Sequence, residues 1–438
     1  EGGTDGETID LEYWYYGSRY NSQVTITLKG AGADRTFLTG NVDADKTKGH
    51  GLFKVQDYTN FNISGITLKD TFRPGGVKGA SIQISSKTFC EAHVTDCNFI
   101  NNHVPENGGG AIGMTEGGVL VARNCLFQNC SGKNGGVIYA TGVSHLTIED
   151  CTFEGNNGTA QNGASVAMLW GNAYMMFNKC IFKDNRASDR AVVNHQQTSV
   201  VFLNACTFEG NSNTQASKYA SAIHASGEFT GINNCTFYKN NIKDGSAPQN
   251  NSECISGNDN MILSNSTFYE YFQANRGVMT GLAAGKEAYI FNNIVLNDYS
   301  GCAFYFSSAG YKITSFGHNI YRNVTDYRSG AAKIGIPAAT GDIAGVEKNI
   351  LGNASYDAVS HLYKWDGTLT NGTIVPATAA EFETCVKSYG TVLANESLAG
   401  TKAGDAFWNW LTSIKATDVD QTGVSRGKSW WPGSYQFN

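Results

Sequence analysis

The sequence predicts an all-β protein, a single-stranded right-handed parallel β-helix of about ten to eleven coils. Three observations predict it: a C-x-F block recurs at nearly constant spacing, a corner of small residues precedes each block, and no long helical pattern lies between blocks. A fixed period of this size is typical of stacked supersecondary units rather than of one globular core. We expect residues 1–325 to form the β-helix with an N-terminal cap, and residues 326–438 to form a small capping or docking segment with short helices.

The C-x-F block predicts one strand of each coil. Successive cysteines are 28, 26, 29, 26 and 29 residues apart, and five of the six blocks read C-x-F-x-x-N. Side chains alternate across a strand, so the cysteine and the phenylalanine point to the same side, which we take as the interior. The six cysteines of this ladder are Cys97, Cys125, Cys151, Cys180, Cys206 and Cys235. Beyond the ladder, we expect mostly apolar residues in the same position, namely Ile66 upstream and Ile294 and Ile320 downstream of Ser266.

The corner of small residues predicts a second strand and the way coils pair. Gly109-Gly110-Ala111-Ile112 and Gly135-Gly136-Val137-Ile138 are two examples, in which glycine permits a sharp turn and the last residue enters the core. Coils of this length without helices are too short for βαβ units, so each strand pairs with its equivalent in the next coil. Strand twist makes right-handed coiling the expected hand.

The ladder cysteines are expected to be free, buried thiols. Stacked Cβ atoms about 4.8 Å apart exceed the usual 3.5–4.5 Å of a disulfide. A metal or redox role is the less favoured alternative, because no histidine accompanies the thiols. The other five cysteines leave one disulfide open: Cys90, Cys130, Cys254, Cys302 and Cys385.

Asparagines end most of the ladder strands. They are expected to turn the chain, since asparagine tolerates the left-handed conformation, and to hydrogen-bond to one another along the stack. The residues are Asn102, Asn156, Asn185, Asn211 and Asn240.

Composition restricts partners and location. A net charge of -6 gives no basic face for nucleic acid, and no run of about 18 apolar residues forms a transmembrane segment. The chain starts at Glu1 without a methionine, so we expect a secreted or cell-surface-anchored protein whose leader has been removed, and a monomer. No cofactor is expected: the calcium-like strings at 41–46 and 418–423 lack the full ligand spacing and are interpreted as turns.

With these motifs, the chain resembles the pectate-lyase-like superfamily of right-handed β-helix proteins, and its GGAI and F-x-x-N elements are similar to polymorphic outer-membrane protein repeats. The resemblance covers residues 24 to 325. The ending "DVDQTGVSRGKSWWPGSYQF" is similar to the D-x-x-G-x-x-R…G-A-Y ending of secreted bacterial β-helix proteins, through Asp420, Gly423, Arg426 and Tyr435. The superfamily includes lyases, hydrolases and adhesins. The W-x-D-H and D-P-H-D strings of its enzymes are absent here, and the hydrolase pattern of paired aspartates followed by G-H-G and R-I-K is unmatched.

A candidate site follows from the position after the corner's apolar residue, which carries Gly113, Tyr139, Ala167, Asn194, His224 and Ser256 in successive coils. Asn194 and His224 are expected to be stacked neighbours. We assign candidate catalytic roles to His224, Arg190 and Lys218. The candidate substrate-binding residues are Tyr139, Trp170, Arg186, Asp189, Asn194 and Tyr219. His195 has inward parity and is expected in the core.

These residue types suit a sugar polymer. Aromatic faces cover sugar C–H surfaces, and polar or charged side chains bind hydroxyls or carboxylates. In a lyase, Lys218 or His224 would remove a proton beside a carboxylate neutralised by Arg190 or Arg186. The favoured hypothesis is an extracellular or surface-attached bacterial protein that binds a polysaccharide or surface glycan, with degradation left open. The alternative is a non-catalytic adhesin or structural surface rod.

The C-terminal segment predicts two short amphipathic helices, within 377–390 and 403–414. Phe407, Trp408 and Leu411 are spaced to form an apolar stripe. Because the ends of a solenoid expose apolar interior, we expect this segment to cap the coils or dock on their side. Trp430 and Trp431 are expected to pack in its core.

Overall fold

The protein is a parallel β-solenoid with two short helices near its C-terminus, which confirms the predicted fold class. The computed structural model describes residues 9–11, 24–41, 43–45, 48–86, 90–160, 163–188, 190, 192–213, 220–240, 254–271, 278–281, 283–297, 303–306, 310–322 and 336–436. The chain divides into two compact units. Unit 1 holds residues 1–176 and 182–200, and unit 2 holds residues 177–181 and 201–438.

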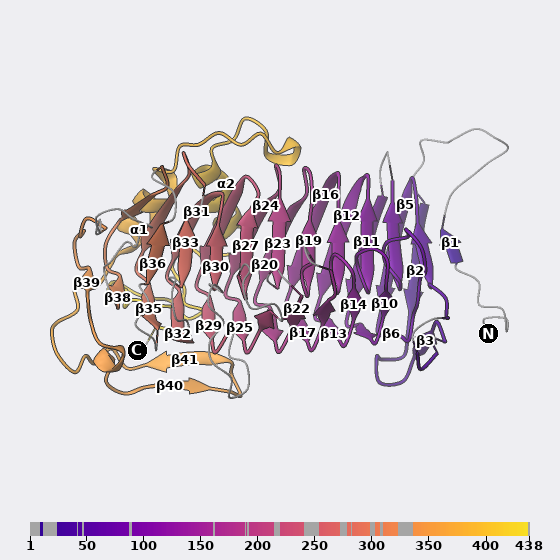
Figure 1. The fold of residues 1–438 in the computed structure, drawn as a ribbon, viewed down its shortest axis with the longest axis horizontal. Coiled ribbons are helices and arrows are strands. Elements are labelled where there is room, and N and C mark those ends of the chain that lie inside the picture. Colours follow the sequence, from indigo (N-terminus) through magenta and orange to yellow (C-terminus); the bar gives the residue numbers. More distant parts are fainter. Residues whose placement is uncertain are drawn as a thin grey trace. The chain divides into compact units, whose positions relative to one another are not determined.

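In unit 1, each coil supplies three strands, and equivalent strands of successive coils pair in parallel (Figure 1). The first strands are β1 (Ile9–Leu11), β4 (Phe53–Val55), β7 (Ile82–Ser85), β11 (Ile112–Thr115), β15 (Ile138–Ala140), β19 (Ala167–Leu169) and β23 (Val193–Gln196). The second strands are β2 (Val24–Lys29), β5 (Thr59–Ser64), β8 (Cys90–Thr95), β12 (Gly117–Arg123), β16 (Val143–Glu149) and β20 (Tyr174–Asn178). The third strands are β3 (Phe37–Thr39), β6 (Thr67–Lys69), β9 (Asn98–Ile100), β13 (Leu126–Gln128), β17 (Thr152–Glu154) and β21 (Ile181–Lys183). A short fourth strand follows in some coils: β10 (His103–Val104), β14 (Ser131–Gly132), β18 (Asn157–Gly158) and β22 (Arg186–Ala187).

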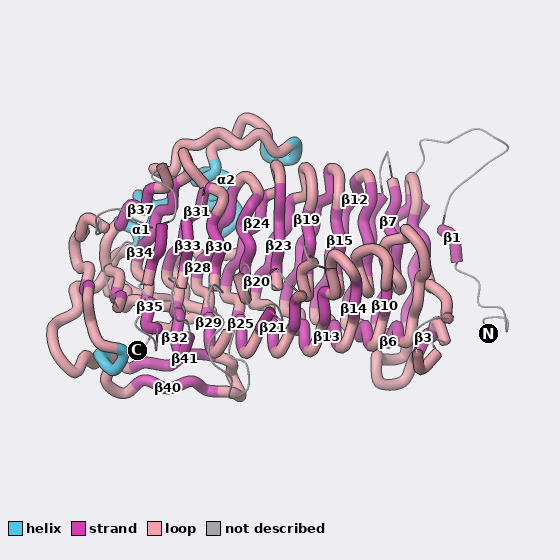
Figure 2. The backbone as a smooth tube through the Cα atoms, viewed as in Figure 1, coloured by secondary structure: helices cyan, strands magenta, loops and turns pink. Residues whose placement is uncertain are grey.

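Unit 2 repeats this plan and adds a hairpin and two helices. Its first strands are β27 (Ile223–Ser226), β30 (Ile255–Gly257), β33 (Met279–Gly281) and β36 (Phe304–Phe306). The second strands are β24 (Val200–Asn204), β28 (Phe229–Asn233), β31 (Asn260–Ser264), β34 (Glu287–Phe291) and β37 (Lys312–Ser315). The third strands are β25 (Thr207–Glu209), β29 (Thr236–Tyr238), β32 (Thr267–Tyr271), β35 (Ile294–Asn297), β38 (Ile320–Tyr321) and β39 (Ile343–Ala344), and β26 (Ser212–Asn213) is a short fourth strand. The remaining elements are the antiparallel hairpin of β40 (Ala354–Asp357) and β41 (Leu362–Trp365), the 3-10 turns η1 (Lys348–Ile350) and η2 (Glu396–Leu398), and the helices α1 (Ala379–Lys387) and α2 (Ala403–Ser413) (Figure 2).

Stacked phenylalanines and buried thiols fill the interior, as the C-x-F block predicts. In unit 1 the rings of Phe99 and Phe127 stack with centroids 4.7 Å apart, and those of Phe127 and Phe153 stack at 4.8 Å. In unit 2, Phe237 and Phe268 stack at 4.3 Å. All six ladder cysteines are buried thiols that form no disulfide, which confirms their structural role. Cys90, Cys130, Cys254 and Cys385 form none either, and Cys302 lies outside the described residues.

Polar residues, not isoleucines, continue the cysteine column in unit 2, so this part of the prediction was wrong. Thr267 pairs with Ile294, which places Asn293 beside Ser266, and Asn319 follows Asn293 in the next coil. The sequence register was one residue off because Ile294 and Ile320 are as apolar as the pattern demands. The asparagine before each isoleucine occupies the column instead. The side-chain oxygen of Asn293, for example, accepts a hydrogen bond from the backbone N–H of Ser266 at 2.9 Å.

The asparagine ladder hydrogen-bonds along the stack, as predicted. Asn156 Nδ2 donates to Asn185 Oδ1 at 2.9 Å, and Asn211 Nδ2 donates to Asn240 Oδ1 at 2.9 Å. The left-handed conformation, however, falls on the residue before the asparagine, for example on Asp184 with a φ of +52°. The side-chain amide is therefore free to enter the core and serve backbone groups there.

The C-terminal segment docks on the side of the coils of unit 2. The periodicity predicted both helices, and α2 buries Ala403, Ala406, Phe407, Trp410 and Leu411. Trp410 rather than Trp408 completes the stripe, since its position continues the 3–4 spacing. The ring of Phe407 lies 5.1 Å from that of Phe202, and the ring of Phe382 in α1 lies 5.8 Å from that of Phe291.

The segment at 418–436 forms a turn that is held by buried hydrogen bonds. Asp420 Oδ1 accepts the N–H groups of Thr422 and Val424, which defines a turn. The buried guanidinium of Arg426 donates to Asn234 Oδ1 at 2.9 Å and to the carbonyl of Gly433 at 2.8 Å. Burial lowers the pKa of Arg426 to about 10, which the charge of Asp420 opposes. Trp430 is buried, as predicted.

Candidate functional site

The outer face of the first strands in unit 1 carries three of the predicted site residues, Tyr139, Trp170 and Asn194. Parallel register sets Gly113, Tyr139, Met168 and Asn194 side by side on successive coils. The predicted alignment had Ala167 in this column, and the structure corrects it to Met168. Ala167 pairs instead with Ile138 and Val193, whose side chains are buried in the core.

Tyr139 is partly exposed on this face and carries a cation above it. The Nζ of Lys78 lies 4.7 Å from the centroid of the Tyr139 ring. Lys78 comes from the loop before β7, and the sequence analysis did not single it out. Burial lowers the pKa of Lys78, which the charge of Glu116 opposes, and burial raises the pKa of Tyr139.

Trp170 lies on the same face, after β19, and is 38% exposed. The backbone N–H of Trp170 donates to the backbone carbonyl of Ala140 at 2.9 Å, so Trp170 lies beside Thr141 of the neighbouring coil. One coil and two residues separate it from Tyr139, a backbone distance of about 8 Å for ideal strands. Two aromatic side chains thus lie on one face of adjacent coils.

Asn194 and the two predicted arginines differ in their exposure to solvent. The side chain of Asn194 is fully buried, and its Oδ1 accepts Gln196 Nε2 at 3.3 Å. Arg186 is exposed on β22, where it pairs with Asn157, and Arg190 is half-buried. Asn194 is thus held by Gln196 within the face, and Arg186 is the exposed residue of the three.

His224 belongs to the first strands of unit 2. It pairs with Ser256, as the sequence alignment predicted, and Ser256 pairs with Thr280. All three side chains are buried although their neighbours Ile223 and Ala225 take the core positions. Ser256 Oγ forms no hydrogen bond with the described part of the chain. Because Asn194 is in unit 1 and His224 in unit 2, their stacking stays a prediction.

Three predicted site residues, Asp189, Lys218 and Tyr219, lie outside the described residues. His195 is fully buried, and its Nδ1 lies 3.3 Å from Ser199 Oγ, which confirms its place in the core. Within the described ranges, no cluster of three acidic, histidine or cysteine residues could hold a metal ion. Nor is any helix there long and apolar enough to cross a membrane.

An open depression of about 500 Å³ lies elsewhere in unit 1, at the corner before the third strands. Asp96, Asn124 and Asp150 line it on successive coils, together with Asp34. Asn124 Nδ2 donates to Asp96 Oδ1 at 2.5 Å, so these side chains bond within their own row. The row serves the corner turns, which are left-handed at Asp96, Asn124 and Asp150.

Comparisons with known proteins agree with the fold. Residues 50–230 match the family model described as right handed beta helix region. Over 180 residues the chain is 28% identical to metabotropic glutamate receptor-like protein P of Dictyostelium discoideum, and over 193 residues it is 26% identical to metabotropic glutamate receptor-like protein R of the same organism. These matches cover 41% and 44% of this chain but span only 12% and 11% of the length of the two relatives.

Among solved structures, a mutant alginate lyase of family PL6 resembles this chain. The likeness has 9% sequence identity and a TM-score of 0.31, and it covers 78% of this chain and 52% of that one. A score this low says nothing about the activity of this chain.

Proposed function

We propose that this protein binds a polysaccharide or surface glycan along the outer face of its first strands, outside the cell or at its surface. The pair of outward aromatic residues, Tyr139 and Trp170, carries the proposal. Aromatic faces cover the apolar C–H surfaces of sugar rings, and the nearby Gln196 and Lys78 offer polar groups for hydroxyls or carboxylates. A monomer, with residues 326–438 acting as a capping or docking segment for a β-helix of residues 1–325, fits this proposal.

The proposal can be extended from binding to degradation of the bound polymer. In a β-elimination, His224 or Lys218 would take the proton from the carbon beside a sugar carboxylate, and Arg190 or Arg186 would neutralise that carboxylate. A C=C double bond would form as the glycosidic C–O bond breaks, and the leaving oxygen would take up a proton from solvent. Asp189 and Tyr219 would add contacts to the sugar hydroxyls. The place of His224 beside Ser256 supports a polar site on this face.

The alternative is a non-catalytic adhesin or structural surface rod, which needs no convergent catalytic groups. Absorbance near 235 nm for unsaturated products and a reducing-end assay, run on a polysaccharide panel, separate the two. Loss of turnover in His224→Ala with binding retained would support a lyase, whereas binding without turnover on every polymer would support the adhesin.

Binding itself is tested by Trp170→Ala. We expect a loss of affinity of about tenfold, because the stacking surface for a sugar is removed. Phe37→Ala is the matched control, since Phe37 is 53% exposed on β3, a third strand. Equal affinities for Trp170→Ala and the wild-type protein on every polymer bound would remove this face from the proposal.

A further inference from the structure

The corner before each third strand is built in the same way along the chain. One residue turns the corner in the left-handed conformation, the next enters the core, and the third begins the strand with its side chain outward. In unit 1 this gives a corner row and a strand row on successive coils, namely Asp96, Asn124 and Asp150, and Asn98, Leu126 and Thr152. In unit 2 the equivalent rows include the corner residues Asn234 and Asn292 and the strand residues Thr207, Thr236 and Thr267.

The strand row of unit 2 binds a later segment of the chain, residues 419–434, which contains neither a helix nor a named strand. Gln421 lies across this row, because its Nε2 donates to Thr207 Oγ1 at 2.8 Å and its Oε1 accepts from Thr236 Oγ1 at 2.6 Å. The backbone N–H of Ser434 donates to Thr267 Oγ1 at 3.0 Å. All three threonines are buried.

The corner row of unit 2 binds the same segment. Arg426 Nη2 donates to Asn234 Oδ1 at 2.9 Å, and Asn234 Nδ2 donates to the carbonyl of Val419 at 2.8 Å. Asn292 Nδ2 donates to the carbonyl of Trp431 at 3.1 Å. The two rows together are therefore a surface that holds a polypeptide segment, with a guanidinium on a corner side chain.

In unit 1 the same two rows are open. They line the depression of about 500 Å³ described above. The three corner residues are exposed to solvent, and the three strand residues are half-buried. The surface that is filled by the chain itself in unit 2 is thus available to a ligand in unit 1.

The open rows also differ from the filled rows in charge. Two of the three corner residues are aspartates, and the turn needs no acid, since Ala205 adopts the same conformation with a φ of +53°. Nearby cations are matched by acids of their own: Arg123 Nε lies 2.7 Å from Glu149 Oε2, and Arg35 Nε lies 3.7 Å from Asp34 Oδ1. The charges of the two corner aspartates therefore favour a cationic ligand.

We propose that the corner and strand rows of unit 1 bind an arginine-containing segment of a partner protein, as the rows of unit 2 bind residues 419–434. Arginine suits the corner aspartates because its guanidinium binds a carboxylate through two N–H groups. Asp96 and Asp150 are two coils apart, about 10 Å, which three residues of an extended chain span. This surface is separate from the first strands, so the inference goes beyond the proposed function and does not depend on it.

Small residues are expected between the arginines of the partner segment. In unit 2, a Cβ atom on Gly433 would lie 2.6 Å from Thr267 Oγ1, so glycine is what lets the segment approach the strand row. A segment that repeats Gly-Gly-Arg combines this close approach with the three-residue spacing of the arginines.

The test uses a fluorescent peptide of four Gly-Gly-Arg repeats and the full-length protein, with fluorescence anisotropy at about 0.15 M salt. The double variant Asp96→Asn/Asp150→Asn removes both charges and keeps the corners, because asparagine already forms this corner at Asn124. We expect it to weaken binding about tenfold. The matched control is Asp45→Asn/Glu106→Gln, which removes the same charge from exposed residues outside the depression and should leave the affinity unchanged.

A second peptide separates the surface from general attraction between opposite charges. It has the same composition with its four arginines consecutive, and it should bind more weakly because its charges no longer match the two-coil spacing. Tighter binding of this peptide, or an equal loss of affinity in the double variant and its control, would overturn the proposal. Absence of binding by the Gly-Gly-Arg peptide to the wild-type protein would overturn it as well. Trp170→Ala should not change the affinity for the peptide, so failure here is distinct from failure of the glycan proposal.

Discussion

At the scale of single residues, the buried asparagines show how a coil with few regular turns satisfies its backbone. Asn185 Oδ1 accepts both the backbone N–H of Asn156 at 3.0 Å and its Nδ2 at 2.9 Å. Its own Nδ2 donates to the carbonyl of Phe153 at 2.9 Å. One side chain thus serves three buried groups of the preceding coil, none of which has water as a substitute.

Asn185→Ala is expected to lower the free energy of unfolding by about 3 kcal/mol, because it leaves these buried groups without partners. Chemical denaturation followed by circular dichroism measures the change. Asn157→Ala is the control, since Asn157 is exposed on β18, and it should change stability by no more than about 0.5 kcal/mol. Equally small losses of unfolding free energy in both variants would show that the hydrogen bonds of the Asn185 side chain do not stabilise the protein.

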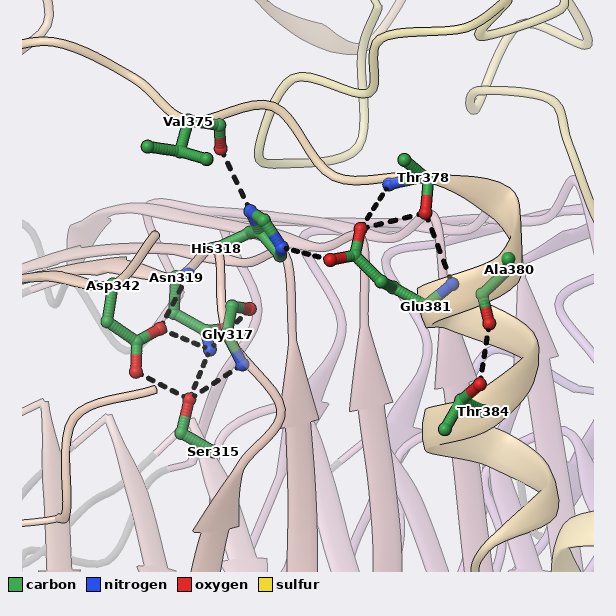
Figure 3. A network of polar contacts seen from close by, with 10 residues as sticks. All are labelled: Ser315, Gly317, His318, Asn319, Asp342, Val375, Thr378, Ala380, Glu381 and Thr384. Atoms are coloured by element: carbon green, nitrogen blue, oxygen red, sulfur yellow. Dashed lines mark hydrogen bonds and ion pairs between the residues drawn. The ribbon is translucent and has the colours of Figure 1, made fainter. Parts of the chain in front are cut away.

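His318 and Glu381 join unit 2's coils to the start of α1 (Figure 3). His318 Nδ1 lies 2.9 Å from the carbonyl of Val375, and its Nε2 lies 3.4 Å from Glu381 Oε1. Both neighbours are acceptors, so only the charged imidazolium can donate to both. Glu381 also closes the capping box of α1 with Thr378.

The pKa of Glu381 gives this contact a pH dependence. Burial alone would raise that pKa, but the hydrogen bond from Thr378 and the charge of His318 outweigh it and lower the pKa below 4.5. A lowered carboxyl pKa contributes stability that is present above pH 4.5 and is lost as the pH falls through the folded-state value. Because the carboxylate is 43% exposed, we expect about 1 kcal/mol or less.

Glu381→Gln keeps the capping box, which glutamine also forms, and removes the charge. The difference in unfolding free energy between wild-type protein and variant should therefore shrink from pH 5.5 to pH 3, measured by urea denaturation. If the difference in unfolding free energy stayed constant over this pH range, the ion pair of His318 and Glu381 would not stabilise the protein. Thr378→Ala, which removes the cap itself, should instead cost about 1 kcal/mol with a different pH profile.

Single-residue register marks the limit of what this sequence predicts locally. The inward parity of Cys and Phe was correct because burial on one face constrains every second residue. Ala167 and Ile294 were placed one position off, since Val166 is as apolar as Ala167, and Ile294 fits an apolar pattern better than Asn293, which occupies the column. Hydrogen bonds to the next coil decide between the two, and residue hydrophobicity does not reveal them.

At the scale of elements, α2 covers second strands that elsewhere would face water. In β28, side chains on both faces are buried, and a Cβ atom on Gly231 would lie 2.6 Å from the Phe407 ring. The absence of a side chain at Gly231 is therefore what lets Phe407 approach the strand. Phe407 also contacts the rings of Phe202 and Phe229.

Phe407→Ala is expected to lower the free energy of unfolding of this docking by about 3–5 kcal/mol, because it removes a fully buried ring and leaves a cavity. Protection of the α2 amides in hydrogen exchange is the direct measurement. Asn409→Ala, on the exposed side of α2, should leave the protection unchanged. Unchanged protection in Phe407→Ala would mean that other contacts hold the helix.

Both helices were predictable from their 3–4 periodicity, whereas the hairpin of β40 and β41 was not. Its strands are only four residues long each, and they are held by contacts distant in sequence. Tyr356 stacks on Tyr238 at 3.7 Å, and its hydroxyl donates to Glu209 at 2.8 Å. Such partners lie more than a hundred residues away, beyond any local pattern.

At the scale of the whole molecule, the repeat predicts the architecture well and the site poorly, for one physical reason. Interior positions must fit their neighbours in the adjacent coils, so their residue types recur with the period. Outer positions have no such constraint, and a residue such as Lys78 reaches the face from a loop whose course the repeat does not encode. Function therefore depends on the part of the coil that varies.

The buried thiols offer a test of the interior throughout the chain. Burial raises the pKa of Cys97 to about 12, with smaller opposing hydrogen bonds, and raises that of Cys90 to about 12 with help from Asp57 and Glu91. At pH 8 such a thiol is thiolate in about one part in ten thousand, and only the thiolate reacts. Burial also blocks access of a reagent.

Native protein carrying Cys302→Ser, which removes the cysteine outside the described residues, should not react with a disulfide reagent at pH 8, because the ten remaining cysteines are buried. Denaturant should release ten reactive thiols. Five belong to unit 1 and five to unit 2, namely Cys90, Cys97, Cys125, Cys130 and Cys151 in the first and Cys180, Cys206, Cys235, Cys254 and Cys385 in the second. Pulse labelling with peptide mass spectrometry at rising denaturant then follows the opening of each unit by its own cysteines. Stoichiometric labelling of any of these thiols in the native state, at the rate of a free cysteine, would show that the coil around it is not closed.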